Sequence, residues 1–381
     1  MSKHIRNILF GWLFLPVLVV VSCQRSLLPD EERKTGADES SVVTLRLAGG
    51  GVDGDTKVIV TDYASQEAAV GRWAYFVFEN GGSYRFVRRG ALTSGTEVSF
   101  NLPVGQYRIW VVANYPVSGD RAFDFHSVST LGDFNALTSY LGDNASGSLA
   151  MAGTTENAVF TVTKTVGSET LPATVHLERL VSKVTLVNIR RAFTDATRGS
   201  KSLVLKHVYL TNVYPFSRYS SDLLVSELAT GAANWYNYCG WHRGDSMDAD
   251  EAVDAIVGER NLDISLAQNV TVSFGRSMYF FPNPLPVADD THDLTWTGAR
   301  CTRLVLECVY DNDPSRGCYY SATLPKDDTF SPIVRNRPYS VSVTLKDVGS
   351  PDPEAVQTDV DVEFTCDVYS WGDTYDVGEV S

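Results

Sequence analysis

Short runs in which apolar and polar side chains alternate recur along most of the chain. The first covers residues 42–48, where Val43, Leu45 and Leu47 alternate with more polar neighbours. A period of two is that of a β-strand with one buried face. We therefore predict a first strand over these residues, with the three aliphatic side chains facing the interior.

Further runs with strand character follow at short intervals, separated by turn residues. In the first half they cover residues 73–78, 84–87, 98–102, 107–112 and 159–162. In the second half they cover residues 203–213, 270–274, 277–281, 303–310, 319–324, 339–345 and 360–371. Residues 174–189 are apolar over an unusual length, which predicts one long strand that links two domains or bends between two sheets. Many short strands favour β-sandwiches over alternating βαβ units.

One stretch of the first half has helical periodicity instead. Leu131, Phe134, Leu137 and Leu141 recur at steps of three and four residues, and Thr130 stands where an N-cap is expected. This spacing predicts a short helix across one end of the first sandwich. The predicted fold class is all-β, with a single short helix in the N-terminal domain.

The first 22 residues are predicted to be a signal peptide of the lipoprotein type. The apolar run 8–21 follows two basic residues and is too short for a membrane span of about 20 residues. It ends in Val20-Val21-Ser22-Cys23, which resembles the lipobox of bacterial lipoproteins. Cys23 would then carry two or three acyl chains, enough for stable anchoring. The alternative is an ordinary secretory leader with an incidental cysteine.

Residues 23–41 are predicted to be a solvated tether between lipid and folded protein. They are acidic and nearly free of large apolar side chains. The whole chain has 32 Lys and Arg against 46 Asp and Glu, a formal net charge of −14. So acidic a surface repels phosphate backbones, which excludes nucleic acid as a partner. With 44% hydrophobic and 20% charged residues, the chain is not disordered as a whole.

No pattern of residues marks catalysis, a metal or a cofactor. The six histidines do not pair at metal-ligand spacing, and the nucleophile-elbow sequence Gly-x-Ser-x-Gly is absent. The many acidic residues show no motif that singles out a glycosidase pair. We therefore predict a protein that is not an enzyme and that uses neither metal nor cofactor.

Cys308 and Cys318 stand symmetrically about a predicted turn at residues 311–314. Residues opposite each other in an antiparallel hairpin have β-carbons about 4.5–5.5 Å apart, slightly more than a disulfide prefers. A disulfide and two buried free thiols are both compatible with this spacing.

The strand pattern is lost over residues 217–262, which we interpret as an acidic, aromatic-rich insertion. Its aromatic side chains could stack on the faces of sugars or pack against the sandwich. They are Trp235, Tyr236, Tyr238 and Trp241.

Several stretches, taken together, resemble the fimbrillin superfamily of Bacteroidales fimbriae. Besides the lipobox and a strand ending at Trp371, they are Leu102-Pro103-Val104-Gly105 with Tyr107 to Asn114, Met151-Ala152-Gly153, Val175 to Val184 and Arg335-Asn336-Arg337-Pro338-Tyr339. The resemblance implies two transthyretin-like β-sandwich domains, which we place at residues 42–175 and 176–381. It also implies a surface-exposed lipoprotein of the outer membrane that assembles with other fimbrillin-like subunits by strand donation.

The sequence departs from the pattern of stalk subunits, which the resemblance implies are activated by cleavage after an arginine in the loop behind the first strand. Between Arg46 and Arg72 the one basic residue is Lys57. This favours an anchor or accessory subunit that keeps its first strand. The alternative is a surface adhesin, possibly a fimbrial tip, that binds glycan or a host protein through the aromatic insertion.

Overall fold

The computed structural model divides the chain into two compact units, Met1–Ala37 and Asp38–Ser381. The first unit lies outside the described residues, and all of the described strands and helices belong to the second. The structure describes residues 40–48, 67, 69–119, 121–144, 147–165, 169–222, 250–283, 301–324, 333–353 and 361–368.

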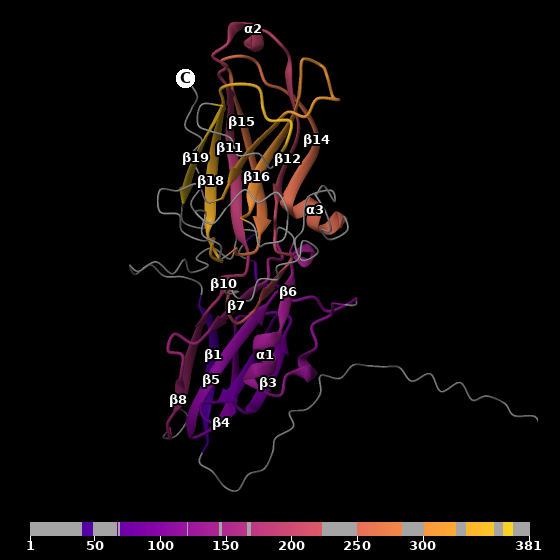
Figure 1. The fold of residues 1–381 in the computed structure, drawn as a ribbon. Coiled ribbons are helices and arrows are strands. Elements are labelled where there is room, and N and C mark those ends of the chain that lie inside the picture. Colours follow the sequence, from indigo (N-terminus) through magenta and orange to yellow (C-terminus); the bar gives the residue numbers. More distant parts are fainter. Residues whose placement is uncertain are drawn as a thin grey trace, which may run out of the picture. The chain divides into compact units, whose positions relative to one another are not determined.

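The first half of this unit contributes two sheets (Figure 1). One has the strand order β4-β1-β9, and the other has the order β10-β7-β5-β2-β3 with β8 paired to β5. The strands are β1 Ser40–Ala48, β2 Trp73–Glu79, β3 Phe86–Leu92, β4 Glu97–Pro103, β5 Gly105–Ala113, β6 Thr138–Tyr140, β7 Met151–Thr154, β8 Phe160–Val162, β9 Thr170–His176 and β10 Glu178–Arg179.

The second half contributes two four-stranded sheets, with the orders β15-β11-β18-β19 and β14-β12-β16-β17. A small sheet pairs β13 with β6 and so joins the two halves. The strands are β11 Ser182–Arg191, β12 Leu203–Thr211, β13 Phe216–Arg218, β14 Gly258–Ser265, β15 Thr271–Phe280, β16 Arg303–Tyr310, β17 Tyr319–Thr323, β18 Pro338–Leu345 and β19 Val362–Val368.

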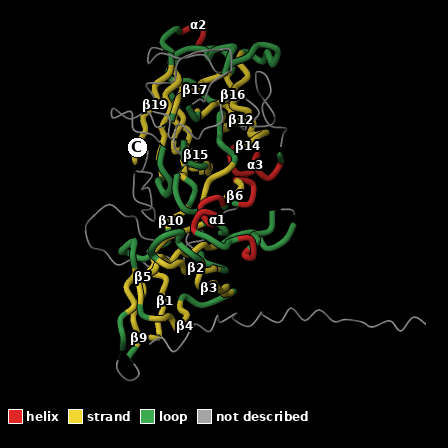
Figure 2. The backbone as a smooth tube through the Cα atoms, turned by 60° about the horizontal axis from the view of Figure 1, so that its bottom comes forward, coloured by secondary structure: helices red, strands yellow, loops and turns green. Residues whose placement is uncertain are grey.

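The predicted all-β class is confirmed, because strands dominate and the described helices are short (Figure 2). They are α1 Leu131–Ala136, α2 Ala196–Gly199 and α3 Glu251–Val257. The predicted helix is α1. Of the two N-cap candidates in the sequence, Ser129 and Thr130, the cap is Thr130, and its capping box pairs Thr130 with Asp133 in both directions. It stops at Ala136 because Leu137 is already extended. The helix is therefore shorter than the apolar spacing predicted.

Strand β2 is apolar from Trp73 to Phe78 because both of its faces are buried. Trp73, Tyr75 and Val77 face the core between the two N-terminal sheets. Phe76 and Phe78 face a second core, which continues into the sheets of the C-terminal half. Because this second core crosses residue 175, the division into domains at 42–175 and 176–381 stays a prediction.

The predicted long strand over residues 174–189 is wrong. The chain forms three strands there: β9 pairs with β1, β10 with β7, and β11 with β15 and β18. The residues between these strands, Leu177, Leu180 and Val181, are buried as well. Apolar residues buried in and between three successive strands, and not one strand, therefore explain the apolar run.

Two further expectations need correction. The runs 270–274 and 277–281 form one strand, β15, in which Gly275 has a left-handed φ of 66°. The end of the predicted insertion is regular structure, because α3 and β14 occupy residues 251–265. Val253 and Val257 are buried in the core, and this packing stabilises a helix that the local sequence pattern does not predict.

Candidate functional site

The candidate site is β1 together with the space that its side chains fill between the two N-terminal sheets, here called the first-strand groove. β1 is the central strand of its sheet. It pairs with β4 in antiparallel register from Ser40↔Pro103 to Arg46↔Glu97. It pairs with β9 in parallel register from Val42↔Thr170 to Ala48↔His176. Withdrawing β1 would therefore leave unpaired backbone groups on two strands at once.

The inward side chains of β1 are buried to the degree expected of a protein core. Val43 and Leu45 are 0% exposed and Leu47 is 6% exposed. They belong to the same cluster as Tyr75 and Phe100, whose rings stack with centroids 4.8 Å apart. Burying each such aliphatic side chain contributes roughly 1.5–3 kcal/mol. The burial of these three side chains together contributes as much free energy as a large part of the net stability of a typical domain. If β1 left the groove, another apolar strand would have to fill it.

The outward face of β1 is mixed, with the exposed Val42 beside Thr44 and Arg46, which form polar contacts. Arg46 donates to Glu97 at 2.6 Å, and both side chains are about half exposed. Thr44 and Ser99 share a hydrogen bond of 2.9 Å between their hydroxyl groups. Exposed ion pairs contribute about 0–1 kcal/mol. Apolar filling and backbone pairing therefore hold the strand, and any strand with the same alternation could make these contacts.

The Leu-Pro-x-Gly-x-Tyr turn beside the groove has a structural explanation. Tyr107 is buried in the groove cluster, and its hydroxyl donates to the carbonyl of Pro103 at 2.9 Å. A β-carbon on residue 105 would lie only 3.3 Å from that hydroxyl. The glycine thus makes room for the tyrosine that closes the turn between β4 and β5.

Cys308 and Cys318 lie opposite each other, as the hairpin predicts. β16 and β17 pair up to Glu307↔Tyr319, and the backbone N–H of Cys308 donates to the carbonyl of Cys318 at 2.8 Å. Both side chains are buried, and both are free thiols in the structure. Burial raises the pKa of each thiol. In the structure, Cys308 and Cys318 are therefore cross-strand neighbours that are not joined by a disulfide.

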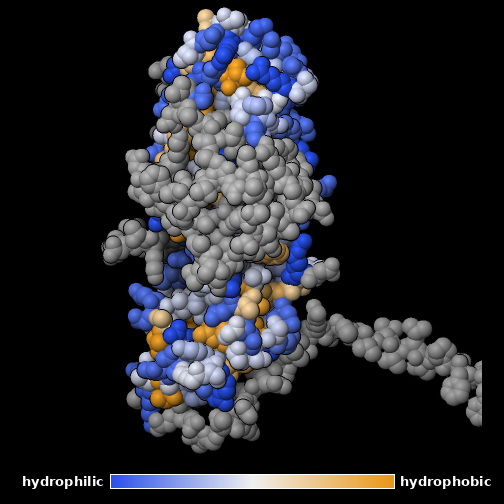
Figure 3. Space-filling model, in the orientation of Figure 1, coloured by the Kyte–Doolittle hydropathy of each residue, from blue (hydrophilic) through white to orange (hydrophobic). Residues whose placement is uncertain are grey.

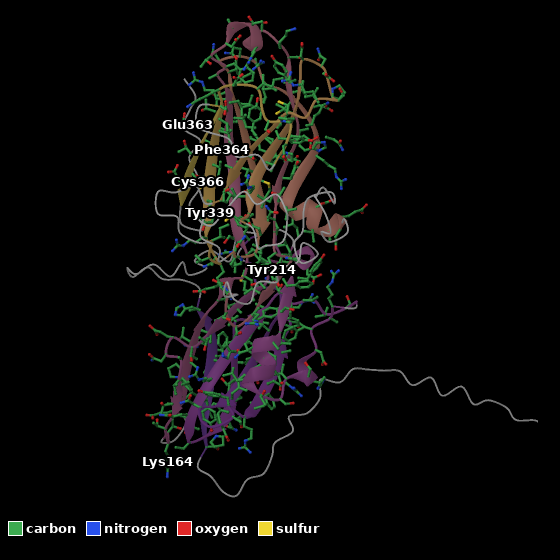
Figure 4. All side chains as sticks on the ribbon, in the orientation of Figure 1. Lys164, Tyr214, Tyr339, Glu363, Phe364 and Cys366 are labelled. Atoms are coloured by element: carbon green, nitrogen blue, oxygen red, sulfur yellow. The ribbon has the colours of Figure 1, made fainter. Side chains whose placement is uncertain are left out.

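The last described strand, β19, lies at the edge of its sheet among the described strands (Figure 4). Its residues alternate between buried and more exposed positions. Val362 and Phe364 are buried, whereas Glu363 is exposed and pairs with Lys346 at 2.8 Å. Cys366 is half-buried opposite Val341 of β18. Charged side chains along an edge discourage unspecific strand addition.

Several predicted site residues lie outside the described residues. These are the lipidation candidate Cys23 and the aromatic group Trp235, Tyr236, Tyr238 and Trp241. Among the described residues, no helix is long and apolar enough to span a bilayer. The same part of the chain contains no cluster of three or more potential metal ligands.

The exposed large apolar side chains of the described residues come from separate segments. On the face shown in Figure 3, apolar surface is interrupted by polar surface. The exposed residues are Val42, Val104, Val117, Phe216 and Val270. Single exposed apolar side chains are normal and do not mark a binding surface.

Charged and polar side chains that the sequence does not mark as a site surround Glu67, in the connection between β1 and β2. Arg179, Lys183 and Asn336 meet there from distant parts of the chain. All three lie in stretches that carry the fimbrillin resemblance, and this was the signal available in the sequence.

No family model and no curated protein matches the sequence. Solved structures do match. A candidate cell adhesion protein from Bacteroides eggerthii is 19% identical, with a TM-score of 0.60 over 88% of this chain and 97% of its own. A candidate cell adhesion protein from Parabacteroides distasonis is 16% identical, with a TM-score of 0.57 over 88% and 100%. A fimbrillin from Porphyromonas gingivalis is 13% identical, with a TM-score of 0.57 over 88% and 98%. The chain therefore has the fimbrillin fold, as its sequence motifs predict.

Proposed function

We propose that the protein is a non-catalytic subunit of a cell-surface fimbrium and that its assembly surface is the first-strand groove. The observation that carries the proposal is the position of β1, which is paired on both edges and fills the groove with Val43, Leu45 and Leu47. A strand from another fimbrillin-like subunit with the same alternation would satisfy the same backbone groups and the same apolar slot. The shared fold with a fimbrillin supports this role.

The proposal includes a lipid anchor at Cys23 in the outer membrane and the acidic tether of residues 23–41. Two or three acyl chains bind a bilayer stably, and the tether holds the folded part away from it. Because Lys57 is the one basic residue between Arg46 and Arg72, β1 is not cleaved from the subunit, which acts as an anchor or accessory subunit. A strand from another subunit then enters the groove by exchange with β1.

The deciding experiment is the intact mass of the protein purified from the cell surface. An anchor starts at acylated Cys23 and retains residues 42–48. An N-terminus beyond residue 48 contradicts the anchor role and supports a processed stalk subunit.

Lipidation is tested separately by detergent-phase partitioning of Cys23→Ala. The variant moves to the aqueous phase because it has lost the acyl chains. Cys366→Ala is the matched control and stays in the detergent phase. Partitioning of Cys23→Ala into detergent would contradict the lipobox.

A second candidate function is adhesion, which the fold shared with candidate cell adhesion proteins favours. Aromatic side chains of the insertion would stack on a glycan, with Trp241 as the test position. Glycan-array binding that is lost in Trp241→Ala but kept in Trp371→Ala supports it. An array without binding contradicts a glycan ligand.

A further inference from the structure

Near its end, the connection between β1 and β2 contains Glu67, whose carboxylate is bound by two side chains of the C-terminal half. Lys183 on β11 donates to the Glu67 carboxylate at 2.9 Å, and the hydroxyl of Tyr279 on β15 donates to its other oxygen at 2.5 Å. Lys183 and Tyr279 are direct cross-strand partners. The side chains of Lys183 and Glu67 are only 11% and 23% exposed, so this ion pair is shielded from water.

The backbone of Glu67 is held as well. Arg179, which is 2% exposed, donates from Nε to the carbonyl oxygen of Glu67 at 2.8 Å. Its Nη1 also donates to the side-chain oxygen of Asn336 at 3.3 Å. Asn336 has a left-handed φ of 57°, and its backbone N–H donates to the carbonyl of Val181. Burial lowers the pKa of Arg179 to about 10, whereas the charge of Glu67 raises it.

A second fixed point follows a few residues later. The side-chain amide of Asn114 donates to the carbonyl oxygens of Ala69 at 2.8 Å and Leu149 at 2.9 Å. Its side-chain oxygen accepts from the backbone N–H of Gly71 at 3.0 Å. Asn114 has a left-handed φ of 56°, which asparagine adopts more readily than most residues. Residues 69–71 are thus tied to the end of β5 before β2 begins.

Among the described residues, the polar side chains that bind Glu67, Ala69 and Gly71 do not come from β1 or from its partner strands β4 and β9, although Val70 packs against the groove cluster. Arg179 belongs to β10, Lys183 to β11 and Tyr279 to β15, whereas Asn114 follows β5. Removing one member of a buried ion pair is costly because the other charge stays buried. Losing any one of the contacts that hold Glu67 is therefore costly, and these contacts come from strands other than β1, β4 and β9.

We propose that Glu67 and residues 69–71 form a clamp that keeps the rest of the protein in place when β1 is withdrawn or exchanged, and that the separable part of the chain lies entirely before Glu67. This inference rests on the proposed function, in which the groove accepts a strand. In this proposal five residues hold the clamp in place. They are Arg179, Lys183, Tyr279, Asn336 and Asn114. A cut before Glu67 leaves the clamp intact, whereas a cut after it separates Glu67 from the strand that follows.

The test is a double-mutant cycle in the full chain, read by hydrogen exchange. Leu45→Asp displaces β1 from its groove, and Glu67→Gln removes the charge of the clamp. With Glu67 in place, Leu45→Asp speeds exchange in β4 and β9 but leaves residues 69–72 and Leu180–Val184 unchanged. In the Glu67→Gln background, Leu45→Asp speeds exchange in these two stretches by roughly tenfold or more.

Glu97→Gln is the matched control, because Glu97 also forms an ion pair but an exposed one with Arg46. Combined with Leu45→Asp it leaves residues 69–72 protected. If Leu45→Asp prevents folding, Leu45→Ala serves as the milder displacement.

The clamp is wrong if Leu45→Asp deprotects residues 69–72 as much as β4 while Glu67 is present. It is also wrong if Glu67→Gln leaves the response of both stretches unchanged. The proposed function fails by a different result, namely a groove that never accepts a strand from another subunit.

Discussion

The carbonyl oxygen of His176 occupies the space that a β-carbon on Gly153 would need. His176 ends β9 and pairs with Ala48 at the end of β1, whereas Gly153 lies in β7 of the facing sheet. The two N-terminal sheets therefore meet by backbone contact at this point. This close approach gives a physical reason for the glycine in the Met-Ala-Gly stretch.

Gly153→Ala is expected to destabilise the protein by at least about 2 kcal/mol, because the added methyl group collides with backbone and not with a flexible side chain. Gly81→Ala is the control, since a β-carbon there has no neighbour within 4 Å. Urea unfolding monitored by tryptophan fluorescence gives both free energies. Equal stabilities for the two variants would contradict the close approach.

Leu45→Asp is expected to lower the free energy of unfolding by more than about 3 kcal/mol, because it places an unpaired carboxylate in the groove. Val42→Asp lies on the same strand but on its outer face, where the side chain is 36% exposed. It should cost less than about 1 kcal/mol. A subunit that has lost β1 by processing should not respond to either change.

The contribution of Glu67 is expected to depend on pH. Burial by itself would raise the pKa of Glu67, but hydrogen bonds from Lys183 and Tyr279 and the charges of Lys183 and Arg179 outweigh it, so the pKa lies below its ordinary value of 4.5. A carboxyl group with a lowered pKa adds stability above its unfolded pKa and loses it as the pH falls through the folded pKa.

The measurement compares urea unfolding of the wild type and Glu67→Gln at about pH 7 and about pH 3.5. The stability difference should be largest near neutral pH and should shrink in acid. A difference that is the same at both values would show that the charge of Glu67 does not contribute. Glu97→Gln, which breaks an exposed pair, should change stability by no more than about 1 kcal/mol.

Alkylation of the folded, reduced protein should modify Cys366 but neither Cys308 nor Cys318. The two cross-strand thiols are buried and have raised pKa values, whereas Cys366 is half-buried. Mass spectrometry of the peptides identifies the modified residues. Rapid labelling of Cys308 would contradict its burial.

The same assay applied to denatured protein from the cell surface, without reductant, distinguishes the two forms of the pair. Free thiols are then labelled at both positions, as the structure has them. Protection of Cys308 and Cys318 alone would show that the hairpin is oxidised outside the cytoplasm.

The alternation of apolar and polar residues predicted which face of a strand is buried wherever one face meets water. Residues 42–48 and 303–310 are strands in the structure with little or no shift in their bounds. The capping box at Thr130 likewise marks the start of α1. These features are local, because the period of a strand and the cap of a helix involve neighbours in sequence.

The tertiary structure decided where both faces of a strand are buried, so that apolar and polar residues do not alternate there. It also decided which residues far apart in the sequence come into contact. Residues 174–189 are rich in apolar side chains because the chain passes through three sheets there, and no local pattern separates that case from one long strand. Glu67, Arg179, Lys183 and Asn336 are spread over 270 positions of the sequence, and only packing brings them into hydrogen-bonding distance. The sequence by itself determined the all-β class and the inward face of β1, because side-chain period is a local property. The clamp at Glu67 depends on long-range contacts between charged groups, which exist only once the sheets have packed.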